Sequence, residues 1–143
     1  MERNINGIKE MGIFASEVLR TLSAHPDHAT VLGLTGDLGS GKTTFAQLFA
    51  QELCVKENVV SPTYVIAKFY DIAHQNWKKF VHIDAYRIEH PDELRQLKWE
   101  QLTTDPKNII LVEWPERMKE QFPADAIMLQ FRFIDQTTRS VTL

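Results

Sequence analysis

The segment GDLGSGKTT, at residues 36–44, constrains the fold of this chain more than any other part of its sequence. It matches the phosphate-loop pattern G-x-x-x-x-G-K-[ST], in which backbone amides wrap around phosphate groups. The apolar run TVLGLT precedes the segment, and KTTFAQLFAQEL follows it with apolar residues at helical spacing. Because this loop requires a strand, a glycine-rich turn and a helix in that order, the sequence predicts a strand at 30–36 and a helix at 42–53.

The residue types in this segment suit a nucleoside triphosphate bound with magnesium. Glycine has no β-carbon, so the chain can turn its N–H groups toward a phosphate, and the following helix adds its positive end. We expect Lys42 to bridge the β- and γ-phosphates and Thr43 to offer its hydroxyl to Mg²⁺. The predicted phosphate contacts are Gly36, Asp37, Leu38, Gly39, Ser40, Gly41, Lys42, Thr43 and Thr44.

Two acidic residues at predicted strand ends are candidates for the metal and water chemistry. In NIILVEW, Glu113 follows four apolar strand residues, which is the position of a Walker-B acid. In FVHIDAYRI, Asp84 ends another strand, and alternation places His82 on the same face. One carboxylate would hold Mg²⁺ and the other would position the attacking water, with Glu113 favoured as the metal partner. The alternative is that both acids are solvated surface groups. The predicted catalytic residues are Lys42, Asp84 and Glu113, and the predicted metal ligands are Thr43, Glu113 and Asp84.

Four residues near these motifs have both a functional and an ordinary interpretation. Thr63, in SPTY, either contacts the γ-phosphate or the metal's water shell, or belongs to a plain turn. Trp114 either covers the site or packs in the core, and Arg117 either reaches phosphate or is a surface arginine. His82 has too few histidine or cysteine neighbours in the sequence for a zinc site, so we interpret it as a packed histidine or one that supports a metal ligand.

The remaining patterns predict an α/β fold with a mixed sheet of about seven strands flanked by helices. Helical spacing indicates a helix at about 7–24, and HPDELRQL and PERMKEQF each begin a short helix near a proline. Alternation predicts a strand at 64–72, joined by a hairpin to one at 80–88, and a last hairpin at 126–143 that turns at DQTT. We expect the centre of the sheet to be parallel and to contain TVLGLT and IILVE.

Length and composition limit the class of protein. The 143 residues suit a single domain over 1–143, and Cys54 as the only cysteine suits a reducing compartment. The charged first residues predict no signal peptide, and no apolar stretch approaches the ~20 residues that cross a bilayer, so we expect a cytoplasmic protein without a membrane partner. The net charge of −3 and the lack of a basic stripe argue against a stand-alone nucleic-acid binder.

Taken together, GDLGSGKTT, SPTY, HIDAYR with PDEL, and VEWPER resemble the TsaE family over nearly the whole chain. These are small bacterial ATPases required to make threonylcarbamoyladenosine in tRNA. The resemblance implies a three-layer P-loop NTPase-like fold, with ATP and Mg²⁺ as cofactors. It also implies a complex with the threonylcarbamoyl transferase subunit (TsaD) and its paralogue (TsaB), which ATP hydrolysis resets between turnovers. Contact with tRNA is expected to be only indirect.

The resemblance also carries over to particular residues. It makes the loop, Thr43 and Glu113 the contacts of ATP and Mg²⁺, and it makes Asp84 a residue needed for hydrolysis. Trp99 stands where the family often has a smaller residue, and we expect it to alter a surface. The purine is expected between the segment before the first helix, near Asn4 and Ile5, and the last hairpin turn, near Thr137 and Arg139.

Two other functions stay open at this stage. A small nucleoside or metabolite kinase would need an acceptor pocket and usually an arginine-bearing lid, and the segments after Glu113 are short for one. A nucleotide-gated binding module would use ATP only to set its shape for a partner, without required hydrolysis. The chain has no N-K-x-D motif for reading guanine, which favours adenine in each case.

Overall fold

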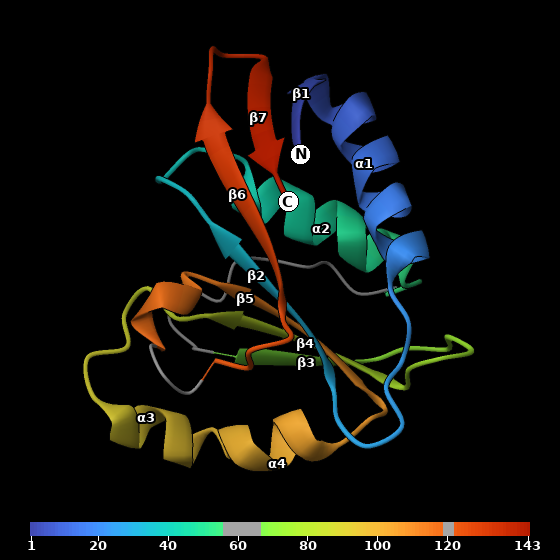
Figure 1. Cartoon of the computed structure of the whole chain (residues 1–143), viewed down its shortest axis with the longest axis vertical. Helices are drawn as coiled ribbons and strands as arrows, with labels where there is room; N and C mark the ends of the chain where they lie inside the picture. Colours follow the sequence, from blue (N-terminus) through green and yellow to red (C-terminus); the bar gives the residue numbers. More distant parts are fainter. Residues whose placement is uncertain (56–66, 119–121) are drawn as a thin grey trace.

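The computed structural model describes residues 1–55, 67–118 and 122–143, which form one mixed sheet with helices on both faces (Figure 1). Within these residues the sheet has seven strands in the order β1-β7-β6-β2-β5-β4-β3. The elements are β1 (Glu2–Asn6), α1 (Gly7–Thr21), β2 (Thr30–Thr35), α2 (Lys42–Glu52), β3 (Ala67–Asp71), β4 (Lys79–Asp84), α3 (Pro91–Gln96), α4 (Trp99–Thr104), β5 (Asn108–Glu113), the 3-10 turn η1 (Pro115–Arg117), β6 (Ile127–Phe133) and β7 (Thr138–Thr142).

The centre of the sheet is parallel, as the sequence predicts. β2 pairs in parallel with both β5 and β6, and β5 pairs in parallel with β4. Antiparallel strands β3, β7 and β1 complete the two edges. β5 is buried along its whole length, which explains its continuous apolar sequence. The predicted three-layer α/β fold with a mixed sheet is confirmed.

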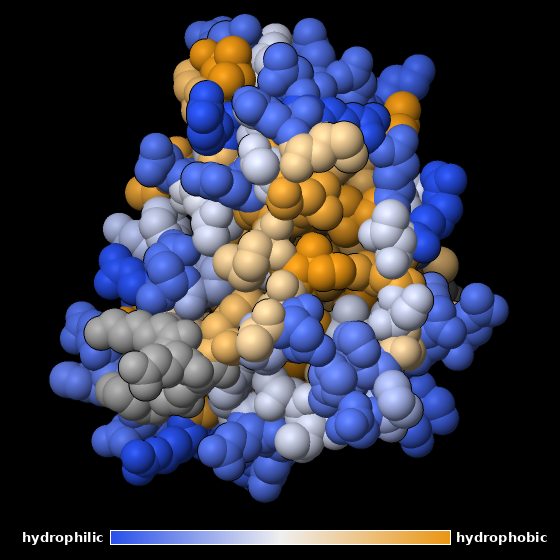
Figure 2. All heavy atoms as spheres, viewed as in Figure 1, coloured by the Kyte–Doolittle hydropathy of each residue, from blue (hydrophilic) through white to orange (hydrophobic). Residues whose placement is uncertain are grey.

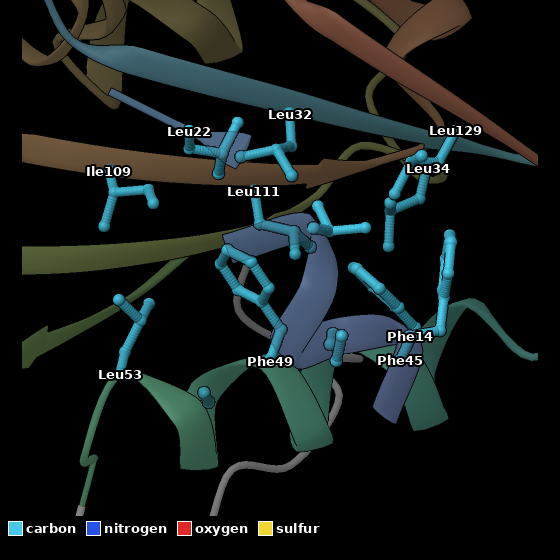
Figure 3. Packing of buried hydrophobic residues seen from close by; sticks show 14 of the residues in the cluster. Phe14, Leu22, Leu32, Leu34, Phe45, Phe49, Leu53, Ile109, Leu111 and Leu129 are labelled. Atoms are coloured by element: carbon cyan, nitrogen blue, oxygen red, sulfur yellow. The ribbon is translucent and has the colours of Figure 1, made fainter. Parts of the chain in front are cut away.

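One face of the sheet packs against α1 and α2. Alternate residues of β2 and β5 point to this side and meet aromatic side chains of the helices. The rings of Phe45 and Phe49 stack at 5.6 Å between centroids, and Phe14 of α1 lies 5.7 Å from Phe45. Figure 3 shows this cluster, whose labelled residues are Phe14, Leu22, Leu32, Leu34, Phe45, Phe49, Leu53, Ile109, Leu111 and Leu129.

The other face packs against α3 and α4. Val31, Ile110 and Val112 point to this side and meet Leu94 and Trp99 of the two short helices. Trp99 is 3% exposed, so the expectation that it alters a surface is wrong: its ring packs in the core. The Trp99 ring is buried because α4 packs against this face of the sheet.

The surface shown in Figure 2 is mostly hydrophilic, with apolar side chains gathered in the middle of the face, between β6 and α1. A second apolar spot lies at the tip of the β6–β7 hairpin, where Phe133 and Ile134 are exposed. None of the helices in the described ranges is long and apolar enough to cross a membrane.

Several predicted boundaries were wrong. The strand expected at 80–88 ends at Asp84, because the chain turns there and the Tyr86 N–H donates to Asp84 Oδ1 at 3.0 Å. Of the helix expected at 115–122, the described residues form only the 3-10 turn η1, and residues 119–121 lie outside the described part. The first helix ends at Thr21 rather than near 24. Neither β1 nor α4 was predicted, and residues 64–66 of the expected strand at 64–72 lie outside the described residues.

Candidate functional site

The glycine-rich loop and both predicted acids lie at the carboxyl ends of the central parallel strands. The loop follows β2, and Glu113 ends β5 opposite Leu34 of β2. Asp84 ends β4 and pairs in register with Glu113. Ligands of open α/β sheets bind at this end of the strands, where neighbouring strands connect in opposite directions. The fold therefore brings together the three motifs that the sequence singles out.

The loop needs glycine for its backbone conformation. Gly36, Gly39 and Gly41 have φ values of +136°, +78° and +108°, which residues with a β-carbon rarely adopt. A Cβ at Gly36 would also lie 2.4 Å from the carbonyl oxygen of Phe131. These glycines let the loop close over the start of α2, whose free N–H groups and positive end can face an anion.

The ammonium of Lys42 lies inside this loop. Its Nζ donates to the carbonyl oxygens of Gly36 and, at 2.8 Å, of Asp37, and it lies 4.4 Å from the centroid of the Trp114 ring. Burial lowers the pKa of Lys42, while the negative charge of Glu113 opposes that shift. The cation is therefore held at the loop by weak acceptors that phosphate oxygens can replace.

Glu113 is fixed through both of its carboxylate oxygens. The Thr43 hydroxyl donates to Oε1 at 3.0 Å, and His82 Nε2 lies 2.7 Å from Oε2. His82 is fully buried and Glu113 is 3% exposed, so water does not compete for these contacts. Thr43 and Glu113 thus offer two adjacent oxygen ligands of the kind that Mg²⁺ prefers. His82 is thus a packed histidine, and it contacts Glu113, the predicted metal ligand.

Asp84 is the more accessible of the two acids. Burial raises the pKa of its carboxyl group, the Tyr86 N–H acts in the opposite direction, and the neighbouring charge of Glu113 raises the pKa further. Two carboxylates side by side at a strand edge repel each other, and a divalent cation between them would remove that repulsion.

Two adjoining cavities surround the loop. The first, which we call the loop pocket, has a volume of about 350 Å³. The second, the hairpin pocket, has about 400 Å³ and shares Gly41, Thr44 and Arg139 with the first. The loop pocket is lined by Leu38, Gly39, Gly41, Lys42, Thr43, Thr44, Asp84, Tyr86, Arg87, Glu113, Trp114 and Arg139. The hairpin pocket is lined by Ile5, Gly7, Ile8, Met11, Gly41, Thr44, Gln136, Thr137 and Arg139.

The hairpin pocket lies where the purine is expected. A backbone hydrogen bond of 2.8 Å from Gly7 N to Thr137 O joins the start of α1 to the β6–β7 turn. Ile5, Thr137 and Arg139 all line this cavity. Asn4 does not line it: alternation along β1 places Asn4 and the buried Ile5 on opposite sides of the strand.

The remaining candidates are more scattered. Thr63 lies outside the described residues. Arg117 lies 5.3 Å from the centroid of the Tyr86 ring and is not among the residues that line the loop pocket. Trp114 lines the loop pocket beside Lys42 and also packs against the hydrophobic core, so its position agrees with both interpretations.

Sequence reasoning missed several lining residues. Tyr86 and Arg87 belong to HIDAYR, two and three residues after Asp84, so the quoted motif already contained a signal for them. Ile8, Met11 and Gln136 carry no such signal, because they reach the hairpin pocket only through the pairing of β1 with β7.

Comparison with known proteins agrees with the motifs. The family model described as "Threonylcarbamoyl adenosine biosynthesis protein TsaE" matches residues 7–141. A TsaE from Rickettsia typhi is 31% identical over 136 residues, covering 94% of this chain and 88% of the relative. A TsaE from Bacillus subtilis is 32% identical over 125 residues, covering 87% and 75%.

A solved structure supports the same assignment. The crystal structure of YdiB from Bacillus subtilis superimposes with a TM-score of 0.69 at 26% identity, covering 99% of this chain and 82% of that one. The similarity extends over the loop, both acids and the closing hairpin, because it spans almost all of the chain. The chain therefore belongs to the TsaE family of threonylcarbamoyl adenosine biosynthesis proteins.

Proposed function

We propose that this protein binds ATP with Mg²⁺ in the loop pocket and hydrolyses it in support of threonylcarbamoyladenosine formation in tRNA. The observation that carries the proposal is the contact of 3.0 Å between the Thr43 hydroxyl and Glu113, with Lys42 and Asp84 lining the same cavity. Phosphoryl transfer to water needs groups that hold the phosphates, ligands that hold the metal ion, and a further group that positions the water.

In this proposal each group has a separate task. Backbone amides of the loop and the Lys42 ammonium hold the β- and γ-phosphates, and Thr43 and Glu113 hold Mg²⁺. The metal ion would neutralise charge that develops on the phosphate oxygens. His82 keeps the Glu113 carboxylate in one orientation through the 2.7 Å contact. Asp84 accepts a hydrogen bond from the attacking water and orients it toward the γ-phosphate, and it also reaches the metal.

The hairpin pocket would take the adenine base. Its apolar side chains, among them Ile5, Ile8 and Met11, suit the faces of a purine ring, and Thr137 offers a polar edge. The two pockets share Gly41 and Thr44, so a nucleotide can lie with its phosphates in one and its base in the other.

The proposed partner is the TsaD–TsaB transferase complex, which carries out the transfer reaction itself. Leu38 is 73% exposed and Tyr86 is 39% exposed, and both line the loop pocket, so its rim is open to solvent or to another protein. An open site admits bulk water around the phosphates, so we expect slow hydrolysis by the protein alone. Hydrolysis would reset the complex between turnovers.

Phosphate release from Mg·ATP, measured with and without the transferase complex, tests this function. We expect slow release alone and faster release in the complex. No phosphate release under either condition would contradict the proposal. Transfer of the phosphoryl group to an added nucleoside or metabolite would favour a kinase. Continued cycling of tRNA modification with Asp84→Asn or Glu113→Gln protein would favour a binding module.

A further inference from the structure

A second group of polar side chains lies at the amino ends of the central strands, at the opposite end of these strands from the loop. His25 and His28 belong to the connection between α1 and β2, and Asp125 lies two residues before the start of β6. One ligand atom from each of the three residues lies within 4.8 Å of the others. β2 has six residues, so this group is about 20 Å from the loop pocket. It takes no part in the proposed ATP chemistry.

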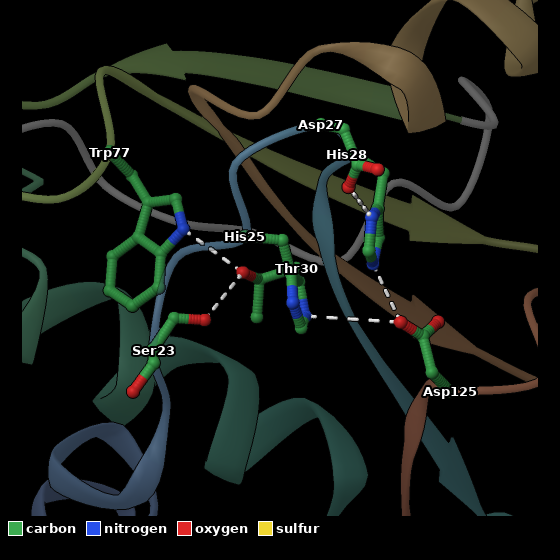
Figure 4. Close-up of polar contacts among 7 residues, drawn as sticks. All are labelled: Ser23, His25, Asp27, His28, Thr30, Trp77 and Asp125. Carbon is green, nitrogen blue, oxygen red and sulfur yellow. Dashed lines mark hydrogen bonds and ion pairs between the residues drawn. The ribbon is translucent and has the colours of Figure 1, made fainter.

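The three side chains converge on one point, as Figure 4 shows. His28 Nε2 lies 2.6 Å from Asp125 Oδ2, and His25 Nε2 lies 3.9 Å from the same oxygen. The two imidazole rings stack with centroids 4.1 Å apart and 14° between their planes. Both Nε2 atoms therefore face one carboxylate, and the three ligands come from segments about a hundred residues apart in the sequence.

Asp27 fixes the orientation of His28. Its Oδ1 lies 2.6 Å from His28 Nδ1, and His28 Nε2 lies equally close to Asp125, so both ring nitrogens face carboxylate oxygens. When a metal ion replaces the proton on Nε2, Nδ1 can still donate to Asp27, and the Nε2 lone pair points to the Asp125 side. This carboxylate–histidine arrangement is the support that metal-binding histidines usually have, because it fixes the tautomer and makes the other nitrogen more basic.

The segment that carries the two histidines is anchored to the core. The buried Trp77 donates from Nε1 to Thr30 Oγ1 at 3.1 Å, and that hydroxyl donates to Ser23 O at 3.3 Å (Figure 4). Ala29 N donates to Thr103 O at 2.8 Å. On the other side, Ile127 begins β6 two residues after Asp125 and pairs with Leu32 of β2. The ligand atoms are therefore held near one another by the fold.

We propose that His25, His28 and Asp125 bind a divalent transition-metal ion of the zinc class. Two imidazole nitrogens and one carboxylate suit Zn²⁺, Co²⁺ or Ni²⁺, whereas Mg²⁺ and Ca²⁺ prefer ligand sets of oxygen alone. Such an ion sits about 2.0–2.2 Å from its nitrogen and oxygen ligands, so the His28–Asp125 contact must open slightly to admit it. His28 and Asp125 have side chains 36% and 52% exposed, so water can complete the coordination.

The bound ion would join the connection before β2 to the segment before β6. An ion that binds only the folded chain raises its thermal stability by mass action. The inference does not depend on the proposed ATPase function, because the two sites share no residue. It predicts metal-dependent stability even in a protein whose loop pocket has been disabled.

Zinc binding to the full chain, freed of metal by chelation, tests this site directly. Calorimetric titration with Zn²⁺ should show one ion per chain, and Co²⁺ should give the visible absorption of a site with nitrogen ligands. The double variant His25→Gln/His28→Gln should bind Zn²⁺ at least about ten-fold more weakly, and Asp27→Asn should weaken binding by about ten-fold. The control His90→Gln removes a histidine that lies outside the cluster, directly before α3, and should bind as the unchanged chain does.

Glu113 and Asp84 line the loop pocket and the buried His82 contacts Glu113, so a second control is needed. Glu113→Gln should leave Zn²⁺ affinity and the zinc-dependent rise in melting temperature unchanged. Equal affinity in the unchanged chain and in His25→Gln/His28→Gln would overturn the proposal, and so would loss of binding in Glu113→Gln. Circular dichroism establishes that each variant is folded, and Asp125→Asn offers an independent loss of one ligand.

Discussion

The two halves of the candidate nucleotide cleft are built differently. The loop pocket lies on the ends of β2, β4 and β5, in the parallel centre of the sheet, and its charged groups are held by buried contacts such as that between His82 and Glu113. The hairpin pocket lies at the antiparallel edge, between β1, the first turn of α1 and the β6–β7 turn, and its lining surface is mostly apolar.

Because of this difference, we expect the two pockets to contribute differently to nucleotide binding and turnover. In the loop pocket, fixed charges face each other across a few ångströms, so removing one leaves another uncompensated. In the hairpin pocket, apolar contacts add smaller increments that scale with the area they cover. We therefore expect the loop pocket to determine turnover and the hairpin pocket to determine which nucleotide is held. The following experiments test that division.

Lys42→Ala should have the largest effect. It removes the ammonium that we assign to the β- and γ-phosphates, and we expect kcat/KM for ATP to fall by about 1000-fold. Phosphate release measures this. Lys107→Ala is a matched control, since Lys107 is exposed at the amino end of β5. Normal ATPase activity in Lys42→Ala would refute the assignment of the loop.

Asp84→Asn should reduce hydrolysis more than binding. The amide keeps the acceptor for the Tyr86 N–H but loses the charge that orients water, so we expect kcat to fall by about 100-fold. Phosphate release and calorimetric binding of Mg·ATP separate the two effects. Asp71→Asn, at the exposed end of the neighbouring β3, should change neither. Equal losses of turnover and affinity would show that Asp84 mainly positions nucleotide or metal.

Ile8→Ala should weaken the base contact without affecting phosphate binding. Loss of an apolar contact of about 1 kcal/mol corresponds to about a five-fold weaker affinity for ATP. Inorganic triphosphate, which has no base, should bind as before, and calorimetry can compare the two ligands. Ile13→Ala is the control, because Ile13 is also exposed on α1 but lines neither pocket. If Ile8→Ala weakened triphosphate binding equally, the division of the cleft would be wrong.

Asp84→Asn should also stabilise the free protein slightly, which is the smallest expected effect. Folding raises the pKa of Asp84, so the folded state favours the neutral carboxyl, and ionisation costs stability as pH rises above its ordinary value of 3.8. The amide avoids that cost at neutral pH. The gain in the free energy of unfolding is less than about 1 kcal/mol, because the group is only partly buried. Without Mg²⁺, the melting temperature of the variant should be higher than that of the unchanged chain at pH 7, and the difference should disappear below pH 3.8. A gain that persisted at low pH would argue against this electrostatic cause.

The sequence predicted best those site residues that lie in one continuous motif or at the end of an apolar strand. The phosphate loop is one continuous segment, so Lys42 and Thr43 could be assigned from their positions in it. Glu113 and Asp84 follow apolar runs, and strand ends of a parallel sheet meet at one edge, so their proximity could be expected before the structure.

Features that depend on distant segments were missed. β1 has only Ile5 buried, so its polar sequence ERNIN lacks the alternation of an ordinary strand. α4 has six residues and begins after Lys98 in a left-handed conformation, which no helical pattern announces. The cluster of His25, His28 and Asp125 was missed for the same reason, because its members are brought together only by the pairing of β2 with β6.

The most direct test of the central claim is a crystal structure with Mg²⁺ and a non-hydrolysable ATP analogue. The account predicts the triphosphate inside residues 36–44, the metal ion on Thr43 and Glu113 with Asp84 beside it, and the adenine in the hairpin pocket. An analogue bound elsewhere on the protein, with the loop empty, would contradict the account.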